Sequence, residues 1–382
     1  MRLLYLSCDP GIPVLGHKGA SVHVRELATA LSDLGADVAI ASPRTEPAGD
    51  VLEASVELMS IPPIPTKASE ADLRAAHETQ REAIADVARS FGAEAIYERY
   101  SLFGAAGVEV AVSLGIPHVL EVNAPLRAEA RRFRTLPHRE LAAEIERSVF
   151  RGTDRVLAVS STLRRWLEAE GVESGRIEVV PNAIAPDRIG RRQPRDDDEF
   201  VLGFCGSLKA WHGIDVLLEA FAIALAAEPT LRLEVVGSGP LDYLLGSANL
   251  PAGRVRAFGA LPHAEALERL RRWDVGVAPY LPLEGFYFSP LKVVEYMAVG
   301  ICPVASALGD LPALLSGGGR GVLVPAGDAR RLGSVFLELA HDRERAAELG
   351  RRARKYVLDA HTWERNARVA LDSFRASREL AA

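Results

Sequence analysis

Short apolar segments alternate with longer amphipathic segments along most of the chain. The apolar runs at 3–6 and 38–40 predict buried strands, and the helical spacing of the apolar residues between them predicts a helix. We expect Ser21 to cap that helix and Gly35 to end it. Further strands are predicted at 95–97, 118–122, 155–159 and 177–180, and helices at about 69–91, 101–114, 126–151 and 161–170. Strands that alternate with helices are typical of an α/β fold with a mostly parallel sheet.

The same alternation starts again after a polar interruption. Residues 186–198 are charged, contain proline and have few apolar side chains, so we expect a linker there. Beyond it, strands are predicted at 200–205, 233–236, 254–258, 275–278, 302–304 and 321–324, and a helix at about 213–227. The sequence therefore predicts two Rossmann-like domains, residues 1–185 and 199–360, followed by a C-terminal helix at about 361–382.

Composition narrows the class of protein. The 45 Lys and Arg residues and the 51 Asp and Glu residues give a net charge of −6, which disfavours non-specific binding to nucleic acid. The three cysteines, Cys8, Cys205 and Cys302, are far apart, so we expect neither a disulfide framework nor a thiolate zinc site. The apolar run after Met1 is too short for a signal peptide, and no window approaches the ~18 apolar residues of a membrane span. We therefore expect a soluble protein of the cytoplasm.

Both predicted domains open with a strand that runs into a glycine-containing loop and then a helix. Such a loop presents backbone N–H groups at the positive end of a helix, which favours a phosphate group. Ligands of open α/β sheets bind beyond the carboxyl ends of the strands, so two such domains facing each other predict a cleft for a phosphate-bearing ligand. The glycines fit neither the G-x-G-x-x-G fingerprint nor a G-K-[ST] loop, which disfavours NAD-dependent dehydrogenases and P-loop NTPases.

Two loops of the second domain carry candidate phosphate chemistry. The first begins at Gly206 and contains Lys209 and His212, two side chains that can present positive charge to a diphosphate. The alternative is a solvated lysine and a histidine at a helix start. The second loop contains Gly237 and Gly239, which permit a close approach of the backbone to a ligand or simply form a tight turn.

A third segment, at 284–300, combines a predicted helix start with a cation and a carboxylate. Ser289 and Pro290 are expected at the N-cap and first helical positions. Lys292 then lies in the first turn, where the helix dipole disfavours a cation unless an anion is bound there. Glu295 is three residues further on the same face, and a carboxylate beside an anion site can hold ribose hydroxyls. The alternative is a surface Lys–Glu pair.

Several segments together resemble the family 4 glycosyltransferases. The resemblance rests on SPLKVVEYMAVGICPVAS at 289–306, GHKGASVHVRELATALSDLGADV at 16–38, VVPNAI at 179–184 and HTWERNARVA at 361–370. It implies the GT-B fold, with two Rossmann-like domains facing across a cleft and the last helix crossing back to the N-terminal domain. It also implies a nucleotide-diphosphate sugar donor, retention of the anomeric configuration, no cofactor and no obligate metal. The N-terminal domain would bind the acceptor and the C-terminal domain the donor.

The family's pair of glutamates is only half present. Glu295 matches the second glutamate, which by resemblance holds the donor ribose. The first falls on Tyr287. Glu284 lies three residues earlier and is the alternative partner if the loop follows a different path.

Other positions of the family also differ. The arginine and lysine after the first strand of the C-terminal domain fall on Ser207 and His212, so Lys209 and Lys292 are expected to replace the lost cations. The family's cleft histidine falls on Asn123, which can hydrogen-bond a sugar hydroxyl but cannot act as a base. We expect Asn123, Lys209 and Lys292 to be the catalytic residues.

A retaining transfer of this family needs positioning and charge stabilisation rather than a protein nucleophile. We expect three groups of residues to supply them. The departing diphosphate would be stabilised by Lys209, Lys292, His212 and the free backbone N–H groups of the segment Ser289, Pro290 and Leu291, in which proline itself has none. The donor site would also include Gly19, Ala20, Gly206, Ser207, Gly237 and Gly239. The acceptor would be contacted by Glu98, Arg99 and Glu121.

Two charged stretches have plainer interpretations. The D-x-D pattern at 196–198 lies in the polar linker, where solvated carboxylates are expected rather than a metal site. A group of arginines after Asn123 forms either an ordinary solvated helix or a basic face for peripheral contact with an anionic membrane. Its members are Arg127, Arg131, Arg132, Arg134 and Arg139.

Two other classes of function remain open from the sequence. A sugar-nucleotide 2-epimerase shares the two-domain architecture, although Asn123 in place of histidine weakens it. A non-catalytic sugar-nucleotide-binding subunit would explain the missing first glutamate. The donor base, the donor sugar, the acceptor and the oligomeric state leave no motif in the chain.

Overall fold

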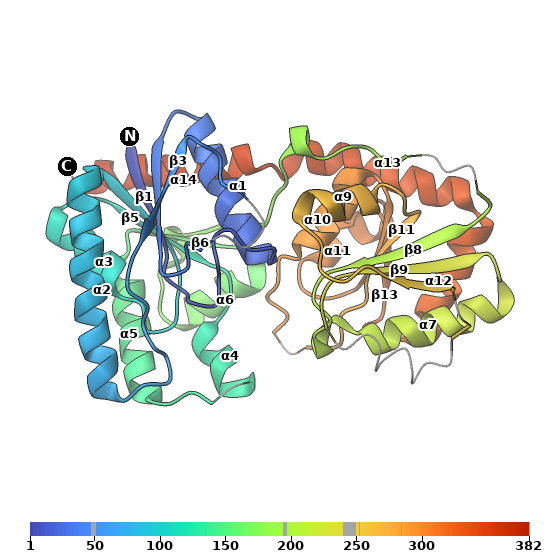
Figure 1. Ribbon diagram of the computed structural model, residues 1–382, viewed down its shortest axis with the longest axis horizontal. Coiled ribbons are helices and arrows are strands. Elements are labelled where there is room, and N and C mark those ends of the chain that lie inside the picture. The colour runs from blue at the N-terminus through green and yellow to red at the C-terminus, as the bar shows by residue number, and fades with distance from the viewer. Residues whose placement is uncertain are drawn as a thin grey trace. The chain divides into compact units, whose positions relative to one another are not determined.

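The chain forms two compact units, each built on one parallel sheet (Figure 1). The computed structural model describes residues 1–46, 51–133, 135–193, 197–239, 250–251, 253–283 and 285–381. The N-terminal unit consists of Met1–Pro181, Tyr287–Ser289 and Trp363–Ala382, and the C-terminal unit of Asn182–Phe286 and Pro290–Thr362. The predicted α/β fold with two Rossmann-like halves is confirmed.

Seven parallel strands form the sheet of the N-terminal unit. They are β1 (Arg2–Ser7), β2 (Asp37–Ser42), β3 (Val56–Ser60), β4 (Ala95–Arg99), β5 (His118–Val122), β6 (Arg155–Ala158) and β7 (Ile177–Val179). Their order in the sheet is β3-β2-β1-β4-β5-β6-β7. β1 and β2 are buried from their second residue to their last, which explains their continuous apolar sequences.

The helices of this unit include the last helix of the chain. They are α1 (Gly19–Asp33), α2 (Glu70–Phe91), α3 (Ala106–Leu114), α4 (Leu126–Phe133), α5 (Arg139–Gly152), α6 (Ser161–Ala169) and α14 (Trp363–Ala381), with a 3₁₀ turn η1 (Ser174–Arg176). α14 packs along α1, and the Trp363 ring meets the His23 ring edge-on at 4.7 Å. The C-terminal helix therefore belongs to the N-terminal unit, as the family resemblance implies.

Six parallel strands form the sheet of the C-terminal unit, in the order β10-β9-β8-β11-β12-β13. They are β8 (Phe200–Cys205), β9 (Leu231–Val236), β10 (Val255–Ala257), β11 (Val275–Ala278), β12 (Cys302–Ser306) and β13 (Val322–Val324). The helices are α7 (Ile214–Ala227), α9 (His263–Leu270), α10 (Leu291–Val299), α11 (Leu311–Leu314), α12 (Ala329–His341) and α13 (Arg343–Ala360), with 3₁₀ turns η2 (Pro186–Arg188), η3 (Ala210–His212) and η4 (Ser316–Gly318).

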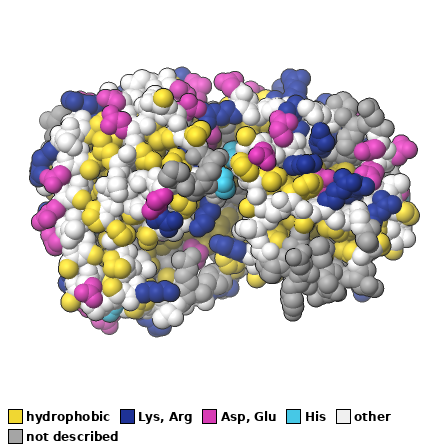
Figure 2. Space-filling model, viewed as in Figure 1, with side chains coloured by type: hydrophobic (Ala, Val, Ile, Leu, Met, Phe, Trp, Pro, Cys, Tyr) yellow, Lys and Arg dark blue, Asp and Glu magenta, His cyan; other side chains and the backbone are white. Residues whose placement is uncertain are grey.

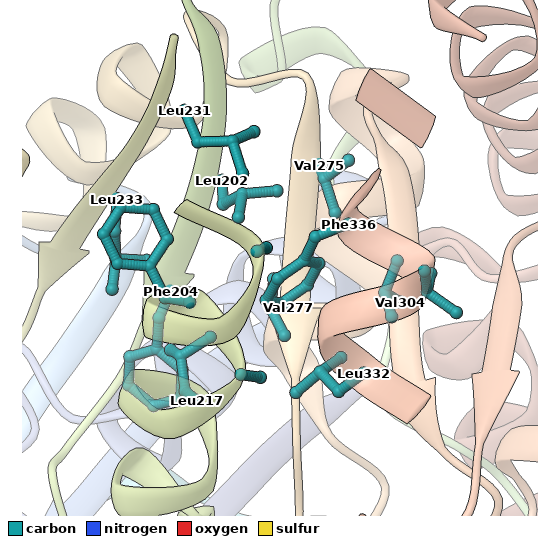
Figure 3. Packing of buried hydrophobic residues seen from close by; sticks show 14 of the residues in the cluster. Leu202, Phe204, Leu217, Leu231, Leu233, Val275, Val277, Val304, Leu332 and Phe336 are labelled. Carbon is teal, nitrogen blue, oxygen red and sulfur yellow. The ribbon is translucent and has the colours of Figure 1, made fainter. Parts of the chain in front are cut away.

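The core of the C-terminal unit lies between this sheet and the pair α7 and α12. Phe204 from β8, Leu217 from α7 and Phe336 from α12 are fully buried and turn toward one another (Figure 3). One window of the described chain, Ala210–Ala227, is apolar and long enough to cross a membrane by length and composition alone. This corrects the expectation that no window approaches that length. The burial of Leu217 and Phe221 is typical of the core helix of a globular domain.

Several predicted elements differ in detail. The strand β3 was not predicted, because it is short and half exposed at the sheet edge. The single helix predicted at 126–151 is two helices, and His138, at φ 51°, directly precedes the second. Ser21 is not a cap, because α1 begins at Gly19 and buries Ser21 in its first turn.

The segment predicted as a linker differs too, because it packs on the C-terminal unit where it is described. The Arg192 N–H donates to the Val299 carbonyl oxygen at 2.9 Å. The Arg192 guanidinium pairs with Asp274, a carboxylate that also accepts the Val201 N–H at 2.8 Å. Residues 194–196, and with them the first aspartate of the D-x-D pattern, lie outside the described residues.

Candidate active site

Two glycine loops meet at the carboxyl edge of the C-terminal sheet. Gly206 follows β8 and Gly237 follows β9, and the Gly206 N–H donates to the Val236 carbonyl oxygen at 2.8 Å. Gly237 has φ 146°, and a Cβ there would overlap the Gly206 carbonyl oxygen. A Cβ at Gly239 would likewise overlap Leu208. Only glycine allows the two loops to approach this closely, so they form a surface of backbone atoms where a ligand of this sheet is expected.

Lys292 points at this glycine surface. A Cβ on Gly206 would come within 2.7 Å of Lys292 Nζ. The ammonium lies 4.0 Å from the centroid of the Phe204 ring and 5.5 Å from that of Tyr280. Within the described ranges Nζ is buried and has no hydrogen-bond partner. Burial lowers the pKa of Lys292 to about 7, although Cys205 and Glu295 oppose the shift.

A buried ammonium without a partner costs folding free energy. The surroundings of Lys292 Nζ can offset this cost by binding an anion. Lys292 is the second residue of α10, whose first-turn N–H groups have no partner within the helix. The positive end of the helix dipole is added to them. We name the Gly206 and Gly237 loops, Lys292 and the start of α10 the anion seat. The alternative of a surface Lys–Glu pair is wrong, because Lys292 Nζ is buried.

The start of α10 differs from the prediction by one residue. The N-cap is Pro290 and the first helical residue is Leu291. Ser289 precedes the cap. The predicted capping role of Ser289 is therefore wrong, whereas Leu291 and Lys292 hold the first-turn positions that the donor site requires.

Glu295 lies one turn after Lys292 and is held by a residue that the sequence did not single out. His263, the first residue of α9, has its Nε2 2.7 Å from Glu295 Oε1. The Glu295 side chain is 8% exposed and the His263 side chain 25% exposed. The carboxylate expected to hold ribose is thus fixed from a neighbouring helix and sits on the α10 face that carries Lys292.

His212 and Lys209 have opposite environments. The His212 Nδ1 contacts the Ser207 carbonyl oxygen, so that nitrogen donates. Burial and the nearby Lys292 charge lower the pKa of His212 to about 3, so the ring is neutral near pH 7 and the expectation of a second cation here is wrong. Lys209 is exposed, with Nζ 4.8 Å from the centroid of the Trp211 ring, and its contact with a diphosphate stays a prediction.

Tyr287 and Ser289 belong to the N-terminal unit. The Tyr287 ring packs into an apolar cluster with Leu163 and Val159, and its carbonyl oxygen accepts the Ser160 hydroxyl at 2.7 Å. Tyr287 is therefore buried where the family has its first glutamate. Its alternative, Glu284, lies outside the described residues.

A buried charge cluster occupies the carboxyl edge of the N-terminal sheet. Glu121 Oε1 is 2.5 Å from His23 Nε2, and its Oε2 is 3.5 Å from Arg99 Nη1. Burial alone would raise the pKa of Glu121, but His23, Arg99 and the Asn123 amide outweigh it and lower the pKa to about 2. The Asn123 Nδ2 is buried and has no hydrogen-bond partner among the described residues, so it remains able to donate to a ligand.

Glu98 has a structural role rather than the predicted acceptor contact. It is 1% exposed, and its Oε2 lies 2.9 Å from His118 Nε2. The other nitrogen of His118 lies 2.8 Å from the Thr153 hydroxyl. This network ties β4, β5 and the start of β6 together inside the sheet. Arg99 and Glu121 reach the edge, and their acceptor contacts stay predictions.

The helix α1 begins at the predicted glycine. Gly19 and Ala20 form its first turn, after the N-cap Lys18. Nothing lies within 4 Å of a Cβ placed on Gly19. The start of α1 therefore offers open backbone, which a phosphate or a hydroxyl can approach.

The basic face, the alternative to an ordinary solvated helix, loses one of its arginines to internal ion pairs. Arg127 is engaged by Glu146 at 2.5 Å and by Glu170 at 2.7 Å. Arg131, Arg132 and Arg139 are exposed, and Arg134 lies outside the described residues. The face drawn in Figure 2 shows acidic and basic side chains interspersed. Within the described part of the chain, no group of three or more His, Cys, Asp or Glu residues is arranged to hold a metal ion.

Sequence reasoning missed His23 and His263. Each pairs with a carboxylate from a distant part of the chain, Glu121 and Glu295. His23 lies mid-helix, and His263 follows Pro262 at a helix start. Neither position differs locally from an ordinary core or cap histidine.

Comparison with known proteins gives the family. The glycosyl transferase 4-like domain matches residues 18–183, and the glycosyl transferases group 1 domain matches residues 199–342. The phosphatidyl-myo-inositol mannosyltransferase of Mycolicibacterium smegmatis is 28% identical over 361 residues, which are 89% of this chain and 85% of the relative.

Two solved structures show the same fold. Sucrose-phosphate synthase from Thermosynechococcus elongatus has a TM-score of 0.79 at 20% identity and covers 100% of both chains. The Anabaena protein HepE, in complex with UDP and glucose, has a TM-score of 0.73 at 17% identity and covers 98% of this chain and 100% of its own.

Two Rossmann-like units of this kind define the GT-B fold. The chain belongs to the family 4 glycosyltransferases. It is an enzyme that transfers a sugar from a nucleotide-diphosphate sugar to an acceptor.

Proposed function

We propose that this enzyme transfers its sugar with retention of configuration and binds the donor diphosphate in the anion seat of the C-terminal unit. The observation that carries the proposal is the buried, unpaired ammonium of Lys292 directed at Gly206. A diphosphate would supply the counter-charge that the described residues do not. Glu295, one turn away on α10, would then lie where the ribose hydroxyls of the same nucleotide need an acceptor.

Catalysis would consist of positioning and charge stabilisation. As the bond from the anomeric carbon to the diphosphate oxygen breaks, negative charge grows on that oxygen. Lys292, the first-turn N–H groups of α10 and the exposed Lys209 would stabilise it. The same oxygen would take the proton of the attacking acceptor hydroxyl on the same face of the sugar, which retains the configuration. Neutral His212 would order the loop through Ser207 rather than add charge.

The N-terminal unit would bind the acceptor and the donor sugar. The buried Asn123 Nδ2, which has no partner among the described residues, would donate a hydrogen bond to a sugar or acceptor hydroxyl. The start of α1 at Gly19 would bring backbone N–H groups to the same region. The Mycolicibacterium relative is named for transfer of mannose to phosphatidyl-myo-inositol, so inositol compounds belong in the acceptor panel. We propose that the enzyme acts in the cytoplasm and that peripheral membrane contact would involve the exposed Arg131, Arg132 and Arg139.

The other two classes of function receive less support. The matching domains and relatives are glycosyltransferases, which favours transfer over 2-epimerisation and over a non-catalytic subunit. Buried Tyr287 in place of the first glutamate requires only that donor-sugar contacts come from other residues. We propose no metal requirement, because two cationic side chains and a helix start can offset the diphosphate charge.

The test is the stereochemistry of the product. UDP-glucose, GDP-mannose and other α-linked nucleotide sugars are incubated with a panel of sugar, inositol and inositol-phosphate acceptors, with Mg²⁺ and with EDTA. We expect one donor to yield an α-linked product by proton NMR at equal rates in both buffers. A β-linked product would contradict retention, loss of activity in EDTA would contradict metal independence, and epimerised donor without transfer would favour the 2-epimerase.

A further inference from the structure

The contact between His263 and Glu295 joins the start of α9 to the middle of α10. His263 is the first residue of α9 and Glu295 lies in α10. The 2.7 Å separation of Nε2 and Oε1 is that of a strong charge-assisted hydrogen bond. The carboxylate is almost enclosed, whereas a quarter of the histidine side chain is exposed. The pair therefore sits at the edge of the unit rather than in its core.

This contact divides the carboxylate into a held oxygen and an available one. Oε1 accepts the His263 N–H, which fixes the rotation of the carboxylate. Among the described residues, none donates a hydrogen bond to Oε2, which therefore keeps its acceptor sites. Two adjacent ribose hydroxyls need an acceptor of fixed direction, because each donates along its own O–H bond. A carboxylate free to rotate would have to be ordered when the nucleotide binds, at a cost in side-chain entropy.

We propose that His263 is a positioning residue that fixes Glu295 for the ribose hydroxyls and thereby makes the nucleotide site select ribose over deoxyribose. The inference rests on the proposed nucleotide site. It adds His263 of α9 to that site and predicts that the site distinguishes ribose from deoxyribose. His263 acts through Glu295 and needs no contact with the nucleotide.

The experiment compares nucleotides that differ only at the ribose. Dissociation constants are measured by calorimetry for UDP and GDP and for their 2′,3′-dideoxy forms. The variants are His263→Leu, His263→Asn, His263→Gln and Glu295→Gln. His341→Leu is the matched control, because His341 is exposed at the end of α12. Thermal unfolding of each variant establishes that it is folded.

For the wild type we expect the ribose form to bind about tenfold or more tightly than the dideoxy form. His263→Leu and His263→Asn should reduce this ratio to about threefold or less, with little change in the affinity for the dideoxy form. His263→Gln can place an amide N–H where Nε2 lies, which the shorter asparagine cannot reach, and it should retain most of the preference. His341→Leu should match the wild type.

Three outcomes would overturn the proposal. An unchanged ribose preference in His263→Leu and His263→Asn would show that Glu295 needs no positioning. An equal loss for both forms of the nucleotide would assign His263 a purely structural role. If Glu295→Gln loses the preference while the His263 variants keep it, the proposed site stands and this inference fails. Binding of neither nucleotide by the wild type would instead reject the proposed site itself.

Discussion

Two charged side chains, Glu121 and Lys292, have buried charged atoms but differ in whether the protein itself supplies a partner for the charge. Glu121 has His23 and Arg99 against its two oxygens, and its pKa is held at about 2. Lys292 has aromatic rings and glycine around it, and burial lowers its pKa to about 7. A charge with internal partners strengthens the fold around it. A buried charge without internal partners destabilises the unliganded protein and can be stabilised by a ligand of opposite charge.

The pKa of Lys292 predicts that nucleotide binding takes up a proton. The groups around it are Cys205 and Phe204 of β8, His212 of η3, Tyr280 after β11 and Glu295 of α10. At pH 8, above a pKa of about 7, free Lys292 is mostly neutral, and a bound diphosphate raises its pKa and favours the charged form.

Calorimetry of UDP or GDP binding at pH 8, in buffers of different ionisation enthalpy, should therefore show uptake of close to one proton. At pH 6, where Lys292 is already charged, uptake through this group should vanish. The Lys292→Arg variant stays charged at both pH values and serves as the control. Uptake at pH 8 that persists in Lys292→Arg would contradict the assignment.

At the scale of elements, the anion seat is built from two loops and one helix. α10 presents Lys292 and Glu295 one turn apart on one face. The loops after β8 and β9 approach each other because Gly206 and Gly237 have no side chains. The seat therefore depends on the backbone of two strand ends as much as on the charges of the helix.

We expect Gly237→Ala to reduce both the stability of the protein and nucleotide binding at the anion seat, more than a glycine substitution in an ordinary turn would. The new Cβ would overlap the Gly206 carbonyl oxygen, and φ of 146° is unfavourable for alanine. We expect a loss of about 2 kcal/mol or more in the free energy of unfolding and weaker binding of UDP or GDP.

Gly35→Ala is the matched control. Gly35 has φ 87°, and nothing lies within 4 Å of its added Cβ. It should cost only about 1 kcal/mol of left-handed strain and leave nucleotide binding unchanged. Urea unfolding and calorimetry measure both effects, and equal losses in the two variants would show that the loops do not need their close approach.

At the scale of the whole molecule, the fold was predictable and the partners of the charged groups were not. Continuous apolar runs such as β1 indicate buried parallel strands wherever they occur, so the two-unit α/β architecture followed from local pattern. Lys292 and Glu295 were predicted because a cation at a helix start is locally anomalous. The pairing of Glu121 with His23, and the place of Tyr287 in the N-terminal unit, depend on residues far apart in the sequence.

The proposal that Lys292 receives the donor diphosphate is tested most directly by calorimetric titration of UDP and GDP into the wild type and into Lys292→Met. Methionine fits the apolar surroundings of Phe204 and Tyr280 without a charge. Lys355→Met, at an exposed position of α13, is the control. We expect the wild type and the control to bind one diphosphate equally well without metal, and Lys292→Met to bind it at least tenfold more weakly while melting at a temperature equal to or above that of the unliganded wild type. Undiminished binding by a folded Lys292→Met variant would contradict the proposed site.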